Sequence, residues 1–226
     1  MIIKSIKKLL FPPKKISYAL NQLDVKLLPY IDFPNGFFIE VGANDGISQS
    51  NTLYFERYKG WKGLLIEAIP GLAEKCRQNR PKCIVENCAL VAAAYPEKTV
   101  EMRYCNLMSL VKGSLNSDED EKKRILSGMQ HLAKDEKTYI VKVPAKTLSE
   151  VLNKHSIEHI DLLSLDVEGY ESQVLKGIDF NKQRIEFMLI EARDREDIEA
   201  VISHLYKPIA ILNTTESYSD ILYRRR

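Results

Sequence analysis

Carboxylates and glycines directly follow three short apolar runs of this chain. The runs stand in the segments FFIEVGANDG (Phe37 to Gly46), LLIEAIP (Leu64 to Pro70) and DLLSLDVEGYE (Asp161 to Glu171). Each run is typical of a buried parallel strand. The carboxyl ends of such strands line the crevice in which open α/β sheets bind their ligands. Three strand ends of this kind predict a nucleotide-like cofactor held over an α/β sheet.

The glycine segment does not fit the two common phosphate-binding loops. Gly42 and Gly46 allow a sharp turn and a close approach to a ligand, but G-x-G-x-x-G is absent and no Gly-Lys-Ser/Thr follows. Glu40 and Asp45 would repel a pyrophosphate and would attract an ammonium or a sulfonium group. S-adenosylmethionine carries both of these charges. We therefore expect it to bind at a rim that includes these four residues and Asn44.

The ends of the next strands complete the expected cofactor site. Glu67 lies 21 residues after Gly46, where a carboxylate can accept hydrogen bonds from both ribose hydroxyls. Asp166 ends a later run, and we expect its strand to neighbour the first, because the crevice lies where the strand order reverses. Small and amide side chains that could bracket an adenine ring follow the third run: Asn87, Cys88 and Ala89.

At these positions the sequence resembles the FkbM family of S-adenosylmethionine-dependent methyltransferases. The resemblance covers about residues 35–95 and 140–223, and it is carried by FFIEVGANDG, SNTLYFE, GWKGLLIEAIP and IDLLSLDVEGYE with VLKG. It implies a class I methyltransferase fold. This is a Rossmann-like α/β fold with a seven-stranded, mainly parallel sheet, helices on both faces and an antiparallel last strand.

The resemblance also bears on the reaction and on individual residues. It implies O-methylation, often of sugar hydroxyls in glycans or natural products. It adds Ala68 to the cofactor site beside Glu67, and it gives Asn51 and Thr52 a pocket role as an alternative to capping a helix. The family often has Lys where this chain has Ser164, which puts any role of that lysine in doubt.

Three acids are candidates for the chemical step. A sugar hydroxyl must lose its proton during attack, and Asp166, Glu168 and Glu191 could converge on the acceptor side of the crevice. One of them would act as a base, or two of them would hold Mg²⁺. The alternatives are that Asp166 binds the ammonium of the cofactor and that Glu168 caps the helix expected near Tyr170.

The chain alternates between apolar runs and helical patterns, as a mainly parallel sheet requires. We expect strands at 37–42, 63–67, 83–88, 161–166 and 185–191, helices near 48–58, 70–79, 147–155 and 171–177, and a closing strand pair at 209–213 and 219–223. The domains expected are an N-terminal helical segment over residues 1–34 and a methyltransferase domain over 35–226. The first contains helices at 1–11 and 16–30. The second carries an insertion or lid at about 106–137, flanked by strands at 99–105 and 138–143.

Composition narrows the partners and the location. A net charge of +2 makes no case for nucleic acid, and no apolar run reaches the roughly 18 residues of a membrane span. Four cysteines without a C-x-x-C pair suggest reduced thiols and a cytoplasmic protein. The lysine-rich residues 1–13 could contact an anionic membrane surface, or pack on their own domain. The sequence does not indicate an oligomeric state.

Two other functions are alternatives to methyl transfer to oxygen. One is a non-catalytic binding or scaffold protein that keeps the fold, which would not need Glu40, Glu67 and Asp166 at one rim. The other is transfer to nitrogen or to another small-molecule acceptor. Asp-Val-Glu-Gly stands where an amino-methylating Asn/Asp-Pro-Pro-Tyr/Phe would be. The expected partner is a small-molecule or glycan acceptor, whose identity the sequence leaves open.

Overall fold

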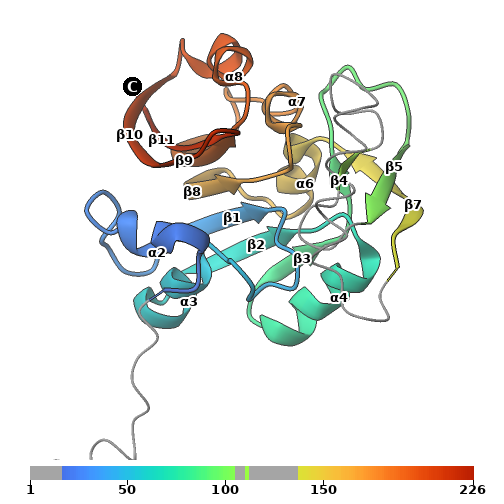
Figure 1. Cartoon of the computed structure of the whole chain (residues 1–226), viewed down its shortest axis with the longest axis horizontal. Coiled ribbons are helices and arrows are strands. Elements are labelled where there is room, and N and C mark those ends of the chain that lie inside the picture. The colour runs from blue at the N-terminus through green and yellow to red at the C-terminus, as the bar shows by residue number, and fades with distance from the viewer. Residues whose placement is uncertain (1–16, 105–109, 112–136) are drawn as a thin grey trace, which may run out of the picture.

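The structure is a computed structural model that describes residues 17–104, 110–111 and 137–226. These residues form a seven-stranded sheet, a smaller four-stranded sheet, and helices against both faces of the larger sheet (Figure 1). Within these ranges no helix is long and apolar enough to cross a bilayer. The helix expected at 1–11, the membrane contact expected of residues 1–13 and nearly all of the segment 106–137 lie outside the described residues.

The larger sheet has the strand order β10-β11-β9-β8-β1-β2-β3. Its strands are β1 (Phe37–Val41), β2 (Lys62–Ile66), β3 (Ile84–Glu86), β8 (His159–Leu165), β9 (Arg184–Ala192), β10 (Tyr206–Thr214) and β11 (Ser219–Arg225). Neighbouring strands are parallel from β9 through β3, and the last strand, β11, is antiparallel to both β9 and β10. The sheet therefore has the predicted number and direction of strands, and β1 lies beside β8 as expected.

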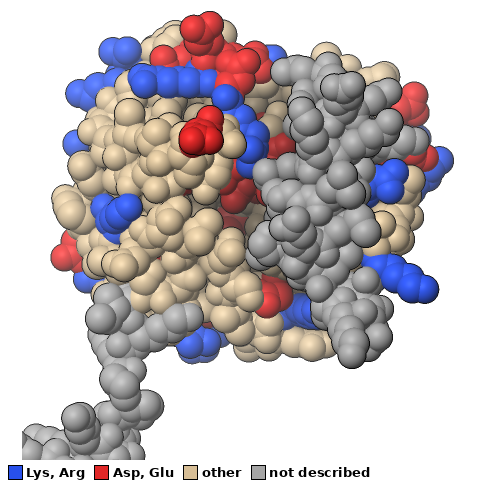
Figure 2. Space-filling view, viewed as in Figure 1, with Lys and Arg blue, Asp and Glu red and all other residues tan. Residues whose placement is uncertain are grey.

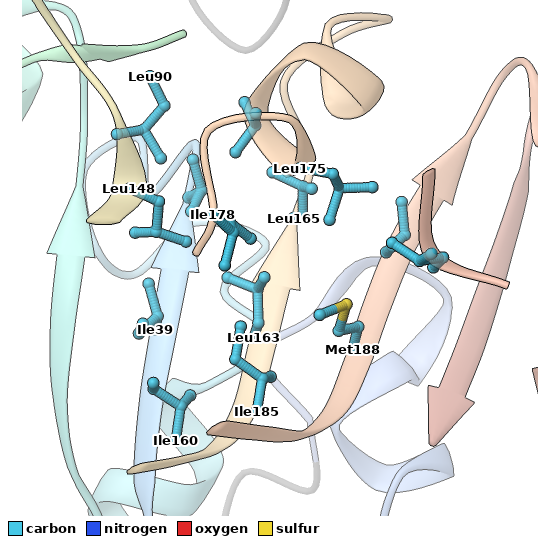
Figure 3. Close-up of a cluster of buried hydrophobic side chains, with 14 of the residues drawn as sticks. Ile39, Leu90, Leu148, Ile160, Leu163, Leu165, Leu175, Ile178, Ile185 and Met188 are labelled. Atoms are coloured by element: carbon cyan, nitrogen blue, oxygen red, sulfur yellow. The ribbon is translucent and has the colours of Figure 1, made fainter. Parts of the chain in front are cut away.

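Each face of this sheet is covered by helices that bury a separate apolar cluster. On one face α6 (Leu148–Lys154), α7 (Glu171–Leu175) and α8 (Arg195–Ile202) pack on the strands, as Figure 3 shows for side chains such as Ile39, Leu148 and Leu163. The other face carries α2 (Leu23–Lys26), α3 (Leu53–Lys59) and α4 (Pro70–Asn79), whose apolar side chains meet those of the central strands. The centre of the sheet is apolar on both sides, which explains the continuous apolar runs in the sequence.

A second sheet arises where the sequence interrupts the alternation. Its order is β4-β7-β5-β6, with β4 (Ala89–Leu90), β5 (Thr99–Tyr104), β6 (Leu110–Val111) and β7 (Tyr139–Lys146). In β5 every second side chain is buried, and these side chains pack in a third apolar cluster with Ile69 and Leu72. The second sheet therefore stands beside the end of β2 and the start of α4.

The prediction of one helix over residues 16–30 is wrong. In its place lie a 3₁₀ turn, η1 (Leu20–Gln22), and the four residues of α2. Asn21 and Gln22 have positive φ angles of 52° and 59°. The buried carboxylate of Asp24 accepts hydrogen bonds from the Tyr18 and Ala19 N–H groups at 2.7 and 3.4 Å. This carboxylate holds the preceding backbone in a turn and so prevents a longer helix.

The helix expected near 48–58 begins later, at Leu53 of α3. Residues 42–52 form a loop in its place, and side chains of buried residues bind the loop backbone. The boundary expected between residues 34 and 35 stays a prediction. Leu23, Leu27 and Ile31, which precede it, pack in the same apolar cluster as Phe38 of β1.

Candidate active site

A cleft of about 830 Å³, counting the space at its mouth, opens at the carboxyl ends of β1, β2 and β8. Its lining includes eight residues predicted for the site from the sequence: Gly42, Asn44, Glu67, Ala68, Cys88, Ala89, Asp166 and Glu168. The structure thus brings together residues that are more than 120 positions apart in the chain.

The glycine loop bends sharply around this cleft. Gly42 has φ +79°, and a Cβ atom there would lie 2.0 Å from the carbonyl oxygen of Asp166. Gly46 has φ +80°, and a Cβ atom there would lie 3.3 Å from Cδ of Arg80. Asn44 and Gln49 also have positive φ angles, of 50° and 59°. Backbone conformations of this kind are common in ligand-binding loops. Here they allow the loop backbone to lie against the end of β8.

Glu67 connects the glycine loop to the end of β2. Its Oε2 accepts a hydrogen bond from the N–H of Asn44 and its Oε1 accepts one from the N–H of Ile69, both at 2.8 Å. The side chain lines the cleft although the residue is only 6% exposed, and this burial raises the pKa of Glu67 to about 7. Each carboxylate oxygen keeps a further lone pair with which it can accept a hydrogen bond from a ligand.

The residues expected to bracket an adenine ring divide into two groups. Cys88 and Ala89 line the cleft, and burial raises the pKa of the Cys88 thiol to about 12, so that it acts there as an apolar group. Asn87 does not line the cleft. Its Nδ2 donates to the carbonyl oxygens of Glu67 and Ala68, at 2.8 Å each, and it therefore fixes the backbone that carries the carboxylate.

Glu40 lies beneath the glycine loop and not in the lining of the cleft. Its Oε2 accepts hydrogen bonds from the hydroxyls of Ser50 and Thr52, at 2.8 and 2.6 Å, and from Nη1 of Arg80 at 3.0 Å. Its Oε1 accepts a bond from the N–H of Asn51 at 2.8 Å. The structure therefore assigns the Glu40 carboxylate to holding the loop and the start of α3.

The other loop residues predicted for the site also act on the loop itself. The Asp45 carboxylate accepts hydrogen bonds from the N–H groups of Ile47 and Ser48 and from the Ser48 hydroxyl. The Asn51 side chain donates to the Ser164 hydroxyl at 3.0 Å. Neither Asp45, Gly46, Asn51 nor Thr52 is among the residues that line the cleft.

Arg80 is central to this loop, and no sequence signal indicated it. The side chain is fully buried, and besides Glu40 it binds Glu56 of α3, with Nε 2.6 Å from Oε2. Its guanidinium lies 4.9 Å from the centre of the Phe38 ring. In the sequence Arg80 stands in a polar stretch after a helix, where most arginines are exposed.

Three carboxylates meet beside the ends of β8 and β9; Asp166 and Glu168 line the cleft, whereas Glu191, also predicted for the chemical step, is not among the lining residues. Oxygens of Asp166, Glu168 and Glu191 lie within 4.8 Å of one another, so the three acids converge as predicted, while their place on the acceptor side stays a prediction. Nη2 of Arg193 donates to Glu168 at 2.8 Å and to Glu191 at 2.6 Å. Burial and the nearby Asp166 raise the pKa of Glu191 to about 8, although Arg193 opposes this shift.

The loop that carries Glu168 is held by a buried acid. Oε1 of Glu171 accepts hydrogen bonds from the N–H groups of Val167 and Gly169, at 3.0 and 3.1 Å. Glu168 itself has φ +61°, a conformation that costs energy for a residue with a side chain. The helix α7 has Tyr170 at its N-cap and no side-chain capping bond, so Glu168 does not cap it.

Sequence reasoning missed several residues that line the cleft. Ser48 and Gln49 follow the glycines, and Tyr170 follows the DVEG segment, so their closeness to the motifs was a usable signal. Leu72 and Met102 gave none. They reach the cleft because α4 and the second sheet pack against each other.

The match to a family model covers most of this structure. The model of the methyltransferase FkbM domain matches residues 40–220. The chain belongs to the FkbM methyltransferase family. Its strand order, with an antiparallel β11, is that of the class I methyltransferase fold predicted from the sequence.

Solved structures similar to this FkbM-family chain share little sequence with it. The FkbM methyltransferase of Methylobacillus flagellatus is 14% identical with a TM-score of 0.49, over 87% of this chain and 45% of that one. A TehB-like SAM-dependent methyltransferase of Corynebacterium glutamicum is 9% identical with a TM-score of 0.47, over 100% and 96%. TrmK of M. capricolum, in complex with S-adenosylhomocysteine, is 11% identical with a TM-score of 0.46, over 92% and 69%. No curated protein sequence matches the chain.

Proposed function

We propose that this protein transfers the methyl group of S-adenosylmethionine to a hydroxyl oxygen of a sugar, in a glycan or a small molecule. The observation that carries the proposal is that Glu67 and Asp166 line one cleft, at the ends of β2 and β8, the two strands that flank β1. The carboxylate of Glu67 is suited to bind a ribose. The end of β8 with Asp166 is suited to receive the reacting hydroxyl. The family match supports methyl transfer.

The donor set of the cleft fits the chemistry of this cofactor. Glu67 would accept hydrogen bonds from the ribose hydroxyls, since a buried carboxylate is a strong acceptor. Leu72, Cys88 and Met102 give one part of the cleft an apolar surface suited to an adenine ring. Asp166 would offer a negative charge to the ammonium or the sulfonium.

The residues at the acceptor side would handle a proton. When bound, S-adenosylmethionine supplies a methyl group from its sulfonium. The sulfur that loses the methyl group becomes a neutral thioether, which is the leaving group. A hydroxyl oxygen that forms a bond to the methyl carbon must release its own proton during attack. Asp166 and Glu168 lie at this side of the cleft, and either carboxylate could accept that proton, so that charge and atoms balance.

Titration calorimetry of the full chain with S-adenosylmethionine and S-adenosylhomocysteine tests the proposal. We expect binding of one molecule of either compound per chain and a rise in melting temperature. NAD serves as the control, because it has a ribose and an adenine but no sulfonium or amino-acid group. The absence of heat and of a thermal shift at millimolar ligand, with binding of NAD, would overturn the proposal.

Replacing Glu67 with alanine should weaken S-adenosylhomocysteine binding at least tenfold. The change removes two charge-assisted hydrogen bonds, each of roughly 1.5–3 kcal/mol before compensation by water. Glu74→Ala is the matched control, because Glu74 is an exposed acid on α4 whose ion pair is with Arg77 of the same helix. Since Glu67 also binds the N–H groups of Asn44 and Ile69, melting curves must show that the variant is folded at the assay temperature. Wild-type affinity in a folded Glu67→Ala protein would assign Glu67 a structural role only.

Cofactor affinity should also depend on pH through Glu67. Burial raises the pKa of this carboxyl to about 7 in the free protein, and only the ionised form can accept both hydroxyl protons. Binding therefore favours the carboxylate, and affinity should fall by about tenfold between pH 8 and pH 6. Calorimetry at the two pH values measures it. The difference should disappear in Glu67→Gln, and an equal pH dependence in that variant would point to another group.

A further inference from the structure

We propose that Arg193 is a positioning residue that supplies the cation of the acidic cluster Asp166, Glu168 and Glu191, in the place where a divalent metal would otherwise bind. This proposal rests on the proposed function, because it concerns the acceptor side of the same cleft. It gives the cluster a built-in counter-charge and makes the proton-accepting carboxylates independent of Mg²⁺.

Arg193 stands between carboxylates that come from two neighbouring strand ends. It follows β9 directly, two residues after Glu191, while Glu168 lies in the loop after β8. A single nitrogen, Nη2, donates to Oε2 of Glu168 at 2.8 Å and to Oε1 of Glu191 at 2.6 Å. One point of positive charge thus bridges two acids, as a metal ion does when two carboxylates share it.

The arginine is held in this position from a third strand. Its guanidinium lies 5.4 Å from the centre of the Tyr218 ring, which comes directly before β11. The Arg193 side chain is 19% exposed. A planar guanidinium can pair with carboxylates and pack on an aromatic ring at the same time, which an ammonium does less well. Arg193 is therefore fixed by contacts with all three strand ends.

A cation beside the cluster is favourable because the crowding of its acids opposes the ionisation of all three at once. The three carboxylates offer oxygens within 4.8 Å of one another, an arrangement that Mg²⁺ or Mn²⁺ could use. Further acids face it from neighbouring elements, with Glu171 on α7 and Asp220 opposite Glu191 in the β9–β11 register. In Figure 2, acidic side chains lie in a hollow near the middle of the view, and basic side chains lie beside them.

A metal that bridged Glu168 and Glu191 would compete with Arg193 for the same oxygens. It would also lie close to the guanidinium, and two cations at short distance repel each other. The arginine also fixes the carboxylate of Glu168, whose backbone is in the left-handed region. Removing Arg193 should therefore both free this carboxylate and open the cluster to a metal.

Titration of the full chain with MnCl₂, followed by the loss of the free-ion electron paramagnetic resonance signal, tests this inference. We expect no wild-type site tighter than about 1 mM, and at least tenfold tighter binding in Arg193→Met, since removal of the guanidinium leaves paired acids unsatisfied. Arg193→Lys should gain less manganese affinity than Arg193→Met, because it keeps the positive charge although an ammonium packs less well on the Tyr218 ring. The gain in Arg193→Met should disappear when Glu191→Gln is added.

Arg195→Met is the matched control, because Arg195 is exposed and pairs with Glu199 on its own helix. Should Arg193→Met fail to fold, Arg193→Gln replaces it with the same expected gain. Two results would overturn the inference: a wild-type manganese site that Glu191→Gln removes, or no gain in the folded Arg193 variants over Arg195→Met. Titration of the same samples with S-adenosylhomocysteine tests the proposed function separately. If the wild-type protein did not bind S-adenosylhomocysteine, the proposed function would fail, but the manganese result would be unchanged.

Discussion

Replacing Arg80 with methionine is expected to lower the free energy of unfolding by about 3–5 kcal/mol. Arg80 is fully buried and makes ion pairs with Glu40 and Glu56, at 3.0 and 2.6 Å. Methionine fills much of the space but leaves two carboxylates without their cation, and Glu40 is itself buried. Chemical denaturation followed by circular dichroism measures the loss, which corresponds to a fall in melting temperature of roughly 10 °C.

Arg77→Met is the matched control for this change. Arg77 lies in the last turn of α4, which ends directly before Arg80; its side chain is 45% exposed and pairs with Glu74 at 3.2 Å. Exposed pairs of this kind contribute little, so the control should lose less than about 1 kcal/mol. Adding Glu40→Gln to Arg80→Met should restore part of the stability, because it removes a buried charge that has lost its partner. A loss in Arg80→Met as small as that in the control would contradict the assignment of Arg80 as the centre of the loop network.

Replacing Glu168 with glutamine is expected to reduce turnover by about 100-fold or more, with cofactor affinity near that of the wild type. Glutamine keeps the shape of the side chain but cannot accept a proton from the acceptor hydroxyl. Its amide can still bind Arg193 through its oxygen, so the loop should keep its conformation. The measurement is single-turnover transfer of a labelled methyl group, made with the acceptor once it has been identified.

Glu196→Gln is the control for Glu168→Gln. Glu196 is exposed in the first turn of α8, so its replacement should leave turnover unchanged. If Glu168→Gln turns over at the wild-type rate, Glu168 is not the base, and the same experiment on Asp166→Asn then examines the remaining carboxylate at this side of the cleft. A loss of cofactor binding in Glu168→Gln would instead place Glu168 in the cofactor site.

The main elements of the fold were predictable because their signals are local. Each apolar run with a carboxylate or a glycine behind it became a strand that ends at the cleft, as in β1, β2 and β8. The strand periodicity of the closing pair, β10 and β11, was also readable. The helix expected at 16–30 was wrong because one buried side chain, Asp24, binds backbone N–H groups ahead of it, and helical periodicity does not reveal such a contact.

The sequence by itself therefore determined which residue types stand at the strand ends, and with them the family and the expected cofactor. The tertiary structure alone decided what each carboxylate faces. Glu40 and Glu67 follow the same kind of apolar run, yet Arg80 binds Glu40 beneath the loop while Glu67 lines the cleft. Arg193 likewise reaches Glu168 because β8 and β9 are neighbours. Contacts between residues distant in the chain depend on packing and on strand order, and these cannot be read from the local pattern of the sequence.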